Sequence, residues 1–482
     1  MKEISLPAAL APLLTMLAGL VAGARYMPLA SPLLVTVMLV SAAVAAAIAS
    51  RRGQDFGRIQ EILGQKLAAV LPVLLILLSI GMLIGSWVFS GTIPMLVHLG
   101  LSFIDPRFLL ITGFLVTCGM SLATGTSWGS AGTVGVALMG MAVALEANLA
   151  ACAGAVISGA YVGDKMSPLS DSTNISAIGA GADLYRHIRH MLYTTTPSFV
   201  VCCIVYTLAG LRMHPASGLG LPPPAEVLTG ELAGAFALSW WMLLPPLVVG
   251  LCMWRKVAPT LAMAYSSLAA VAVGVLVQGF PLRYGLESAV EGFRHQMLPA
   301  AAAGGEFSAT FAKLVDRGGL YSMAGTFVVI LAAFLLAAAL EASGALQRIL
   351  GALLAAARGV FGVIAATLAA GATMIALTSH FGVTALVVGE LFQPAYRERR
   401  LAAVNLSRSL EDSATITEPL MPWTVSAVYM AGTVGVATVD YLPWAVFCYC
   451  GPIFSLLIAA LYRRTGFGIA TLPPEADPAA PR

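Results

Sequence analysis

The chain has 482 residues, of which 59% are hydrophobic and 10% are charged, with a formal net charge of +3 and a mean hydropathy of +0.88. A soluble domain has about 25% charged residues, so this composition excludes a soluble fold. So small a net charge, scattered along the chain, also argues against a nucleic-acid partner. The apolar runs are continuous and do not alternate with polar residues, which favours helices. The composition therefore predicts an all-α polytopic membrane protein.

Apolar runs long enough to cross a bilayer, which takes about 20 helical residues, recur along the chain. They lie at residues 7–23, 28–50, 67–90, 107–124, 191–211, 239–254, 257–279, 319–341, 359–378 and 442–462. Shorter, interrupted runs lie at residues 131–145, 148–162, 381–394 and 416–438. Together they predict about 11 to 13 membrane segments in one membrane domain covering residues 1–482.

Basic residues gather at the ends of these runs and predict their orientation. Arg51 and Arg52, Arg255 with Lys256, and residues 463–464 all fit the same side of the membrane, which would place both termini in the cytoplasm. Residues 212–238 carry one basic residue and are expected to connect two halves of the chain on the outside. Residues 51–66 and 281–318 mix charged and apolar positions at helical spacing, which predicts amphipathic helices at the interface.

A polar stretch, "GDKMSPLSDSTN" at residues 163–174, lies among these apolar segments. An ionised side chain at the bilayer centre costs about 3 kcal/mol or more, so Asp164, Lys165 and Asp171 need a polar cavity if they lie at membrane depth. Pro168 removes a backbone donor and disfavours helical geometry at Ser167, which predicts a broken helix. Exposed carbonyls, hydroxyls and carboxylates at such a break suit an alkali cation.

A second polar stretch, "NLSRSLEDSATITEPLMPW" at residues 405–423, combines Arg408 with Glu411, Asp412 and Glu418. Carboxylates close together in a poorly solvated site do not ionise independently, so a proton can replace a metal cation there. Arg408 or Lys165 could pair with one of these carboxylates and determine which one titrates.

The two stretches belong to a weak internal repeat. "TGTSWG" (124–129) precedes "LSDST" (169–173), and "LTSHFG" (377–382) precedes "LEDSAT" (410–415). Residues 67–211 and 319–462 are therefore expected to be the two repeat halves. Paired, interrupted hydrophobic segments of this kind indicate a transporter with its site between the repeats. Helix-breaking or gating roles are expected for Thr126, Ser127, Trp128, Thr378, Ser379 and His380.

Three stretches, "SGAYVGDKMSPLSDSTNISA", "GTSWGSAGTVGVALMG" and "GELFQPAYRERRLAAVNLSRSLEDSATITEPLMPW", closely resemble the NhaC family of sodium/proton antiporters. The resemblance implies a bacterial inner-membrane antiporter with inverted repeats, broken helices and re-entrant segments, which exchanges sodium or another alkali cation for protons. Asp171 and Asp412 are the expected sodium ligands, and Lys165 and Arg408 the expected charge partners. The full set of expected ion- and proton-binding residues is Asp164, Ser167, Asp171, Thr173, Asn174, Glu411, Asp412, Thr415 and Thr417.

Relatives in the same family exchange organic acids such as malate and lactate, and this alternative stays open because Lys165 and Arg408 could bind an anion. An intramembrane protease is the alternative from another class, but no zinc or serine-protease motif supports it. The expected partners are sodium ions, protons and lipid, with no resident cofactor and no enzymatic activity. The sequence is also compatible with a homodimer.

Overall fold

The computed structural model describes residues 4–103, 105–213 and 223–472. Within these ranges the chain is helical, and its extended pairings are two isolated bridges, Phe293 with Arg317 and Leu401 with Thr471. The expected all-α polytopic fold is therefore confirmed. Part of the expected external connection, residues 214–222, lies outside the described residues.

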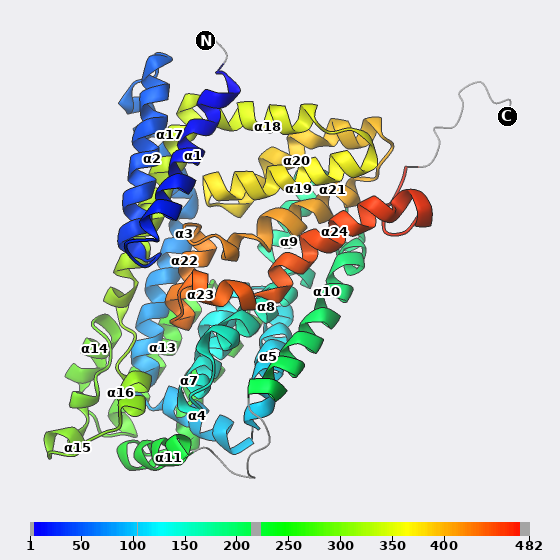
Figure 1. The fold of residues 1–482 in the computed structure, drawn as a ribbon. Helices are drawn as coiled ribbons and strands as arrows, with labels where there is room; N and C mark the ends of the chain where they lie inside the picture. Colours follow the sequence, from blue (N-terminus) through cyan, green and yellow to red (C-terminus); the bar gives the residue numbers. More distant parts are fainter. Residues whose placement is uncertain (1–3, 104, 214–222, 473–482) are drawn as a thin grey trace.

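The first four helices include one of unusual length (Figure 1). They are α1 (Leu6–Gly23), α2 (Ser31–Arg51), α3 (Phe56–Phe89) and α4 (Thr92–Phe103). Helix α3 has 34 residues and begins at Asp55, whose side chain accepts the Arg58 backbone N–H at 2.9 Å. Residues 56–66, part of the stretch 51–66 expected to form an amphipathic helix at the interface, are the first part of α3 and continue without a break into its apolar part.

The next segment contains helices interrupted by short breaks. It consists of α5 (Leu109–Thr124), α6 (Ser127–Ser130), a π-helical turn (Ala131–Gly135), α7 (Val136–Ala144), α8 (Leu149–Met166), α9 (Asp171–Ala180) and α10 (Leu184–Met213). Glycines bring α8 close to α5: a Cβ on Gly159 or Gly163 would lie 2.3 Å from backbone atoms of that helix. Small residues at helix interfaces allow such close packing in membranes.

Residues 223–315 form shorter helices. They are α11 (Pro223–Ala235), α12 (Leu244–Trp254), α13 (Pro259–Leu276), α14 (Leu282–Val290), α15 (Pro299–Ala302) and α16 (Ala309–Val315). Residues 281–318, expected to be amphipathic helices, form α14 to α16 joined by turns, and the Phe293–Arg317 bridge links two of these connections.

The last third of the chain repeats the interrupted pattern. It consists of α17 (Ala324–Ser343), α18 (Ala345–Ala355), α19 (Gly359–Thr378), α20 (Phe381–Glu398), α21 (Ala403–Leu410), a π-helical turn (Glu411–Thr415), α22 (Val425–Val434), α23 (Thr438–Tyr441) and α24 (Val446–Thr465). Short 3₁₀ turns lie at Pro106–Phe108, Trp240–Leu243, His295–Met297, Leu320–Met323, Glu418–Leu420 and Leu442–Trp444.

Ten helices in the described ranges are long and apolar enough to cross a membrane. The number rises to twelve if two sharply bent helix pairs, at residues 225–254 and 425–444, each count as one span. Bends of 101° and 89° at these pairs are the broken or re-entrant geometry expected from the sequence.

Helices from distant parts of the chain pack together around the middle of the molecule (Figure 1). Helix α2 packs against α17, and α13 packs against α3. Closer to the centre, α9 lies against α20, and α22 lies against the π-helical turn that follows α6. The interrupted helices of each segment therefore meet those of the other, and the candidate site lies where they meet.

Candidate functional site

The first break separates α5 from α6. Gly125 ends α5 with φ of 71°, and Thr126 begins α6 by accepting the Gly129 backbone N–H at 3.2 Å. A left-handed residue followed by a side-chain cap is a standard way to end one helix and begin another. The break leaves Ser127 in the first turn of α6, where its hydroxyl faces Asp164.

The second break, between α8 and α9, is where the proline signal predicted it. Helix α8 ends at Ser167, which is extended with ψ of 130°, as expected for a residue before Pro168. Gly163, at the start of the polar stretch, is helical and packed against Leu122. The hydroxyl of Thr173 donates to the carbonyl oxygens of residues 164 and 165, at 3.1 Å each.

The last third of the chain contains two breaks with the same geometry. Ser379 has φ of 54°, and His380 begins α20 by accepting the Val383 backbone N–H at 3.3 Å. Further along, Thr424 caps α22 by accepting the Ala427 backbone N–H at 3.3 Å.

Corresponding positions in the two sets of breaks are all 254 residues apart. Gly125 and Ser379 are both left-handed, and Thr126 and His380 are both side-chain caps. Ser170 and Thr424 cap α9 and α22, which end 254 residues apart at Gly181 and Gly435, both left-handed. The same spacing relates Pro168 to Pro422 and Asp164 to Glu418.

This spacing corrects the repeat alignment made from the sequence. Matching "LSDST" to "LEDSAT" placed Asp171 opposite Asp412, whereas the helix caps place Asp171 opposite Val425. Similar letters misled the alignment because "LEDSAT" lies in the π-helical turn ahead of the break in the last third of the chain, whereas "LSDST" spans the break between α8 and α9.

The left-handed geometry of Gly125 predicts a measurable stability difference. A Cβ at this position would lie 2.7 Å from the Leu169 Cβ and 2.8 Å from its carbonyl carbon, in addition to about 1–2 kcal/mol of left-handed strain. Gly435 is the matched control, because it has the same φ but no atom within 4 Å of an added Cβ. Thermal unfolding in detergent should show a larger loss for Gly125→Ala than for Gly435→Ala; equal losses would contradict the packing argument.

Asp164 is buried, with 8% of its surface exposed, and a hydroxyl donates to each oxygen of its carboxylate. Ser127 donates to one carboxylate oxygen at 2.9 Å, and Ser170 donates to the other at 2.6 Å. The Ser172 hydroxyl lies 2.9 Å from that of Ser170. Two hydroxyls, one from each of two helix breaks, thus bond one carboxylate, and a third hydroxyl bonds one of them.

Glu418, 254 residues after Asp164, is also buried, with 5% of its surface exposed. Its carboxylate accepts the Ser426 backbone N–H at 3.4 Å, and its carbonyl oxygen accepts the Thr424 hydroxyl at 2.6 Å. No basic side chain forms an ion pair with Asp164 or Glu418 within the described ranges.

One cavity of about 510 Å³ brings these two carboxylates together. Its lining includes both acids and residues from the two breaks that follow α5 and α19. The sequence-predicted residues in this lining are Thr126, Trp128, Asp164, Asp171, Ser379, His380 and Thr415. We call it the carboxylate cavity.

The remaining expected charges form a separate buried cluster. Lys165 donates to Asp412, and both side chains are completely buried. Thr194 bridges the pair, because its hydroxyl lies 3.3 Å from the Lys165 Nζ and donates to the Asp412 Oδ1 at 3.2 Å. Glu411 accepts the Ser176 hydroxyl at 3.0 Å, and Arg408 donates to the Gly468 carbonyl oxygen at 2.6 Å.

Several predicted ligands lie outside the carboxylate cavity. Asp412 is paired with Lys165, and Asp171, although it lines the cavity, is exposed in the first turn of α9. Other hydroxyl and amide groups hydrogen-bond to nearby backbone, which stabilises the breaks themselves. The expected residues outside the cavity lining are Ser127, Lys165, Ser167, Thr173, Asn174, Thr378, Arg408, Glu411, Asp412 and Thr417.

Some cavity residues were missing from the site predicted from sequence. Glu418, Ser172 and Ser426 line the cavity, and Ser170, which lies outside the lining, donates to Asp164. The signal that could have found Glu418 is the proline pair, because Pro168 and Pro422 each follow an acidic residue by four positions.

Trp128, which lines the cavity, belongs to an aromatic pair. The rings of Trp128 and Tyr429 stack with centroids 4.2 Å apart, and the Tyr429 hydroxyl donates to the Trp128 carbonyl oxygen at 2.8 Å. This contact joins α6 to α22, which are about 300 residues apart in the chain.

Comparison with known proteins identifies the family. The profile of the Na+/H+ antiporter family matches residues 34–183 and 159–461. The chain belongs to the Na+/H+ antiporter family. It is 42% identical to an uncharacterized Na+/H+ antiporter of Haemophilus influenzae, over 90% of this chain and 91% of that one.

Two relatives from Bacillus subtilis have different named activities. The Na+/H+ antiporter NhaC is 34% identical, over 80% of this chain and 83% of the relative. A malate-2H+/Na+-lactate antiporter is 31% identical, over 89% of this chain and 88% of the relative. The expected NhaC-type membership is therefore confirmed.

Proposed function

We propose that this chain is a secondary antiporter that exchanges sodium ions for protons across the bacterial cytoplasmic membrane. The observation that carries the proposal is the carboxylate cavity, in which Asp164 and Glu418 come from two different helix breaks. Membership in the Na+/H+ antiporter family supports it. Sodium and protons are the transported substrates, so the proposal requires no resident cofactor.

Asp164 has the chemistry for binding either ion. Sodium prefers oxygen ligands: the hydroxyls of Ser127 and Ser170 bond the carboxylate, and the Ser172 hydroxyl lies next to that of Ser170. A hydroxyl that donates to the empty carboxylate can rotate and offer its lone pairs to a cation. A proton neutralises the same charge, so the two ions compete for the site. We assign sodium binding to Asp164, with Glu418 as the second acid, in place of Asp171 and Asp412.

The arrangement of cavities around α22 supports alternating access. Val425 and Ser426 line the carboxylate cavity, whereas Gly432 and Gly435 line a second cavity of about 910 Å³. Tyr429 lies between these positions on α22, stacked on Trp128. In this proposal the aromatic pair separates the two cavities, and its opening would connect the acids to the other side.

The buried charges outside the cavity have a supporting role in this proposal. Lys165 neutralises Asp412, and Arg408 is held by a carbonyl, so neither cation faces the cavity. The halves 67–211 and 319–462 would be inverted repeats whose breaks meet at the cavity. We retain cytoplasmic termini on the basis of the basic residues at the helix ends.

The proposal predicts a sodium-dependent proton flux. The purified protein is reconstituted in liposomes that contain a trapped pH dye. A sodium gradient should drive protons into or out of the lumen, in the direction opposite to sodium. The apparent KM for sodium should rise as pH falls. The rise follows because protons occupy the same site. Lithium, potassium, malate and lactate are tested in parallel, with protein-free liposomes as control.

The organic-acid alternative is decided in the same assay. Lys256 also lines the carboxylate cavity, and this cation is the feature that favours an anionic substrate. A response to malate or lactate, with none to any alkali cation alone, would contradict sodium/proton exchange.

A further inference from the structure

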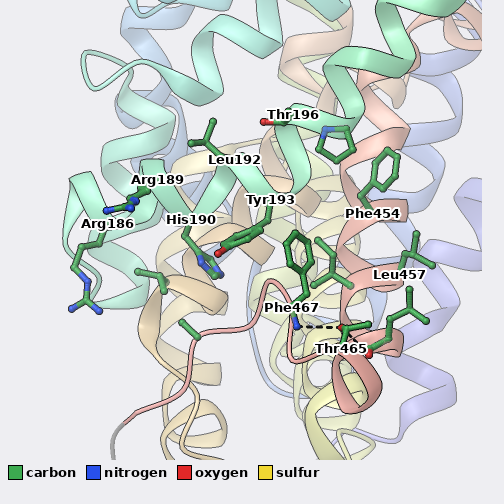
Figure 2. Close-up of a pocket in the computed structure, with 15 residues that line it drawn as sticks. Arg186, Arg189, His190, Leu192, Tyr193, Thr196, Phe454, Leu457, Thr465 and Phe467 are labelled. Atoms are coloured by element: carbon green, nitrogen blue, oxygen red, sulfur yellow. Dashed lines mark hydrogen bonds between the residues drawn. The ribbon is translucent and has the colours of Figure 1, made fainter.

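A groove of about 900 Å³ lies between α10, α24 and the segment that follows α24 (Figure 2). Its volume is near the upper end of the range for ligand pockets, about 300–1,000 Å³. Apolar side chains form most of its lining, among them Leu192, Phe454 and Leu457. Leu192 and Leu457 are each 47% exposed, so in a membrane protein this groove faces the hydrocarbon region.

One end of the groove is basic. Arg186 and Arg189 lie three residues apart on α10, which places them on the same helix face, and both are exposed. Figure 2 shows them together at the end of the groove away from Phe454 and Leu457. Asp183 is the nearest acid in sequence, but its carboxylate caps the helix at the Arg186 backbone N–H. Across the described ranges, neither guanidinium forms an ion pair.

The N-terminus of α10, which the Asp183 carboxylate caps, lies at this end of the groove. Arg186 and Arg189 lie in the first two turns of a helix of 30 residues, whose N-terminus carries a partial positive charge. Phosphate groups bind readily at such helix ends and to paired guanidinium groups.

Packed aromatic side chains hold the groove in shape between its two ends. Phe467 packs edge-on against Tyr193 at 4.9 Å, and Tyr193 packs edge-on against His190 at 5.3 Å. The His190 Nε2 lies 3.1 Å from the Asn405 Oδ1, which also accepts the Ala470 backbone N–H at 3.0 Å. These contacts fix one wall of the groove to α21.

We propose that this groove binds an anionic phospholipid, with the phosphate at Arg186 and Arg189 and an acyl chain along the apolar wall. Basic pockets between membrane helices on the cytoplasmic side are suited to anionic headgroups. A lipid fits both ends of the groove, because a free phosphate would leave the apolar wall uncovered and a neutral lipid would leave the arginines uncompensated. The proposal does not depend on sodium/proton exchange.

Native mass spectrometry of the full-length protein in detergent, titrated with phosphatidylglycerol, tests the proposal. Arg186→Gln with Arg189→Gln should raise the apparent Kd at least about tenfold, because hydrogen bonds to charged groups are lost. Thr196→Trp, which fills the groove without changing charge, should weaken binding as well. Arg348→Gln with Arg397→Gln is the matched control, since these exposed arginines lie outside the groove lining and the charge change is the same.

The ligand class is decided by two further probes. Phosphatidylcholine should bind at least about tenfold more weakly than phosphatidylglycerol, and inorganic phosphate should not displace the lipid. The proposal is overturned if both arginine pairs have the same effect on binding, or if phosphatidylglycerol and phosphatidylcholine bind equally. Full displacement by inorganic phosphate would identify a simple anion site and would overturn it too.

Discussion

Asp164→Asn is expected to reduce sodium-dependent proton flux to the background of protein-free liposomes. The substitution keeps the size of the side chain and one carbonyl oxygen for the Ser127 or Ser170 hydroxyl. It removes the charge that sodium and protons share in the proposed cycle, so neither ion can replace the other. Glu418→Gln should impair the same flux, because the two acids line one cavity.

Asp171→Asn is the matched control for this prediction. Asp171 follows Asp164 by seven residues, and the substitution changes the charge by the same amount. Asp171 is exposed, and an exposed charge contributes about 0–1 kcal/mol, so its loss should change the apparent KM by no more than about fivefold. If instead Asp171→Asn abolishes the flux and Asp164→Asn preserves it, the original assignment from sequence is restored. Circular dichroism and gel filtration establish that each variant is folded.

Lys165→Met is expected to cause the largest loss of stability among single substitutions at the buried charges. Lys165 and Asp412 are both completely buried and hydrogen-bonded to each other. Removing one partner of a buried ion pair leaves an uncompensated charge and costs about 3–5 kcal/mol. The measurement is thermal or denaturant unfolding of the purified protein in detergent.

Two further variants show whether the effect comes from the unpaired charge. Lys165→Met combined with Asp412→Leu should recover most of the lost stability, because replacing a whole buried pair by apolar residues is often neutral. Lys66→Met breaks the partly exposed pair with Glu341, at 2.7 Å, and should cost about 1 kcal/mol or less.

The same double variant tests the role of this pair in transport. If Lys165 and Asp412 serve only to stabilise the fold, the double variant should retain sodium-dependent flux. If the folded double variant loses the flux, Asp412 acts in ion binding, as the sequence interpretation expected. The unfolding measurement shows whether the double variant is folded, so that a loss of flux can be assigned to ion binding and not to unfolding.

The amino-acid sequence by itself determined the fold class and the helix breaks. Hydropathy is a local property, so runs of apolar residues predict membrane helices without knowledge of their neighbours. Proline geometry is local too, which is why Pro168 predicted the end of α8 at Ser167. The motif "GDKMSPLSD" indicated the family for a similar reason, because it is a short and specific stretch of the chain.

Only the tertiary structure decided which charges meet. Lys165 and Asp412 are 247 residues apart, and nothing near either one in sequence shows that they pair. Asp412 is paired with Lys165 outside the cavity lining, and Asp164 and Glu418 are the buried acids that line the cavity. The similar sequences "LSDST" and "LEDSAT" predicted that Asp171 corresponds to Asp412, because sequence similarity does not show which residues cap helices. Burial and ion pairing depend on the packing of whole helices, and the structure alone contains that information.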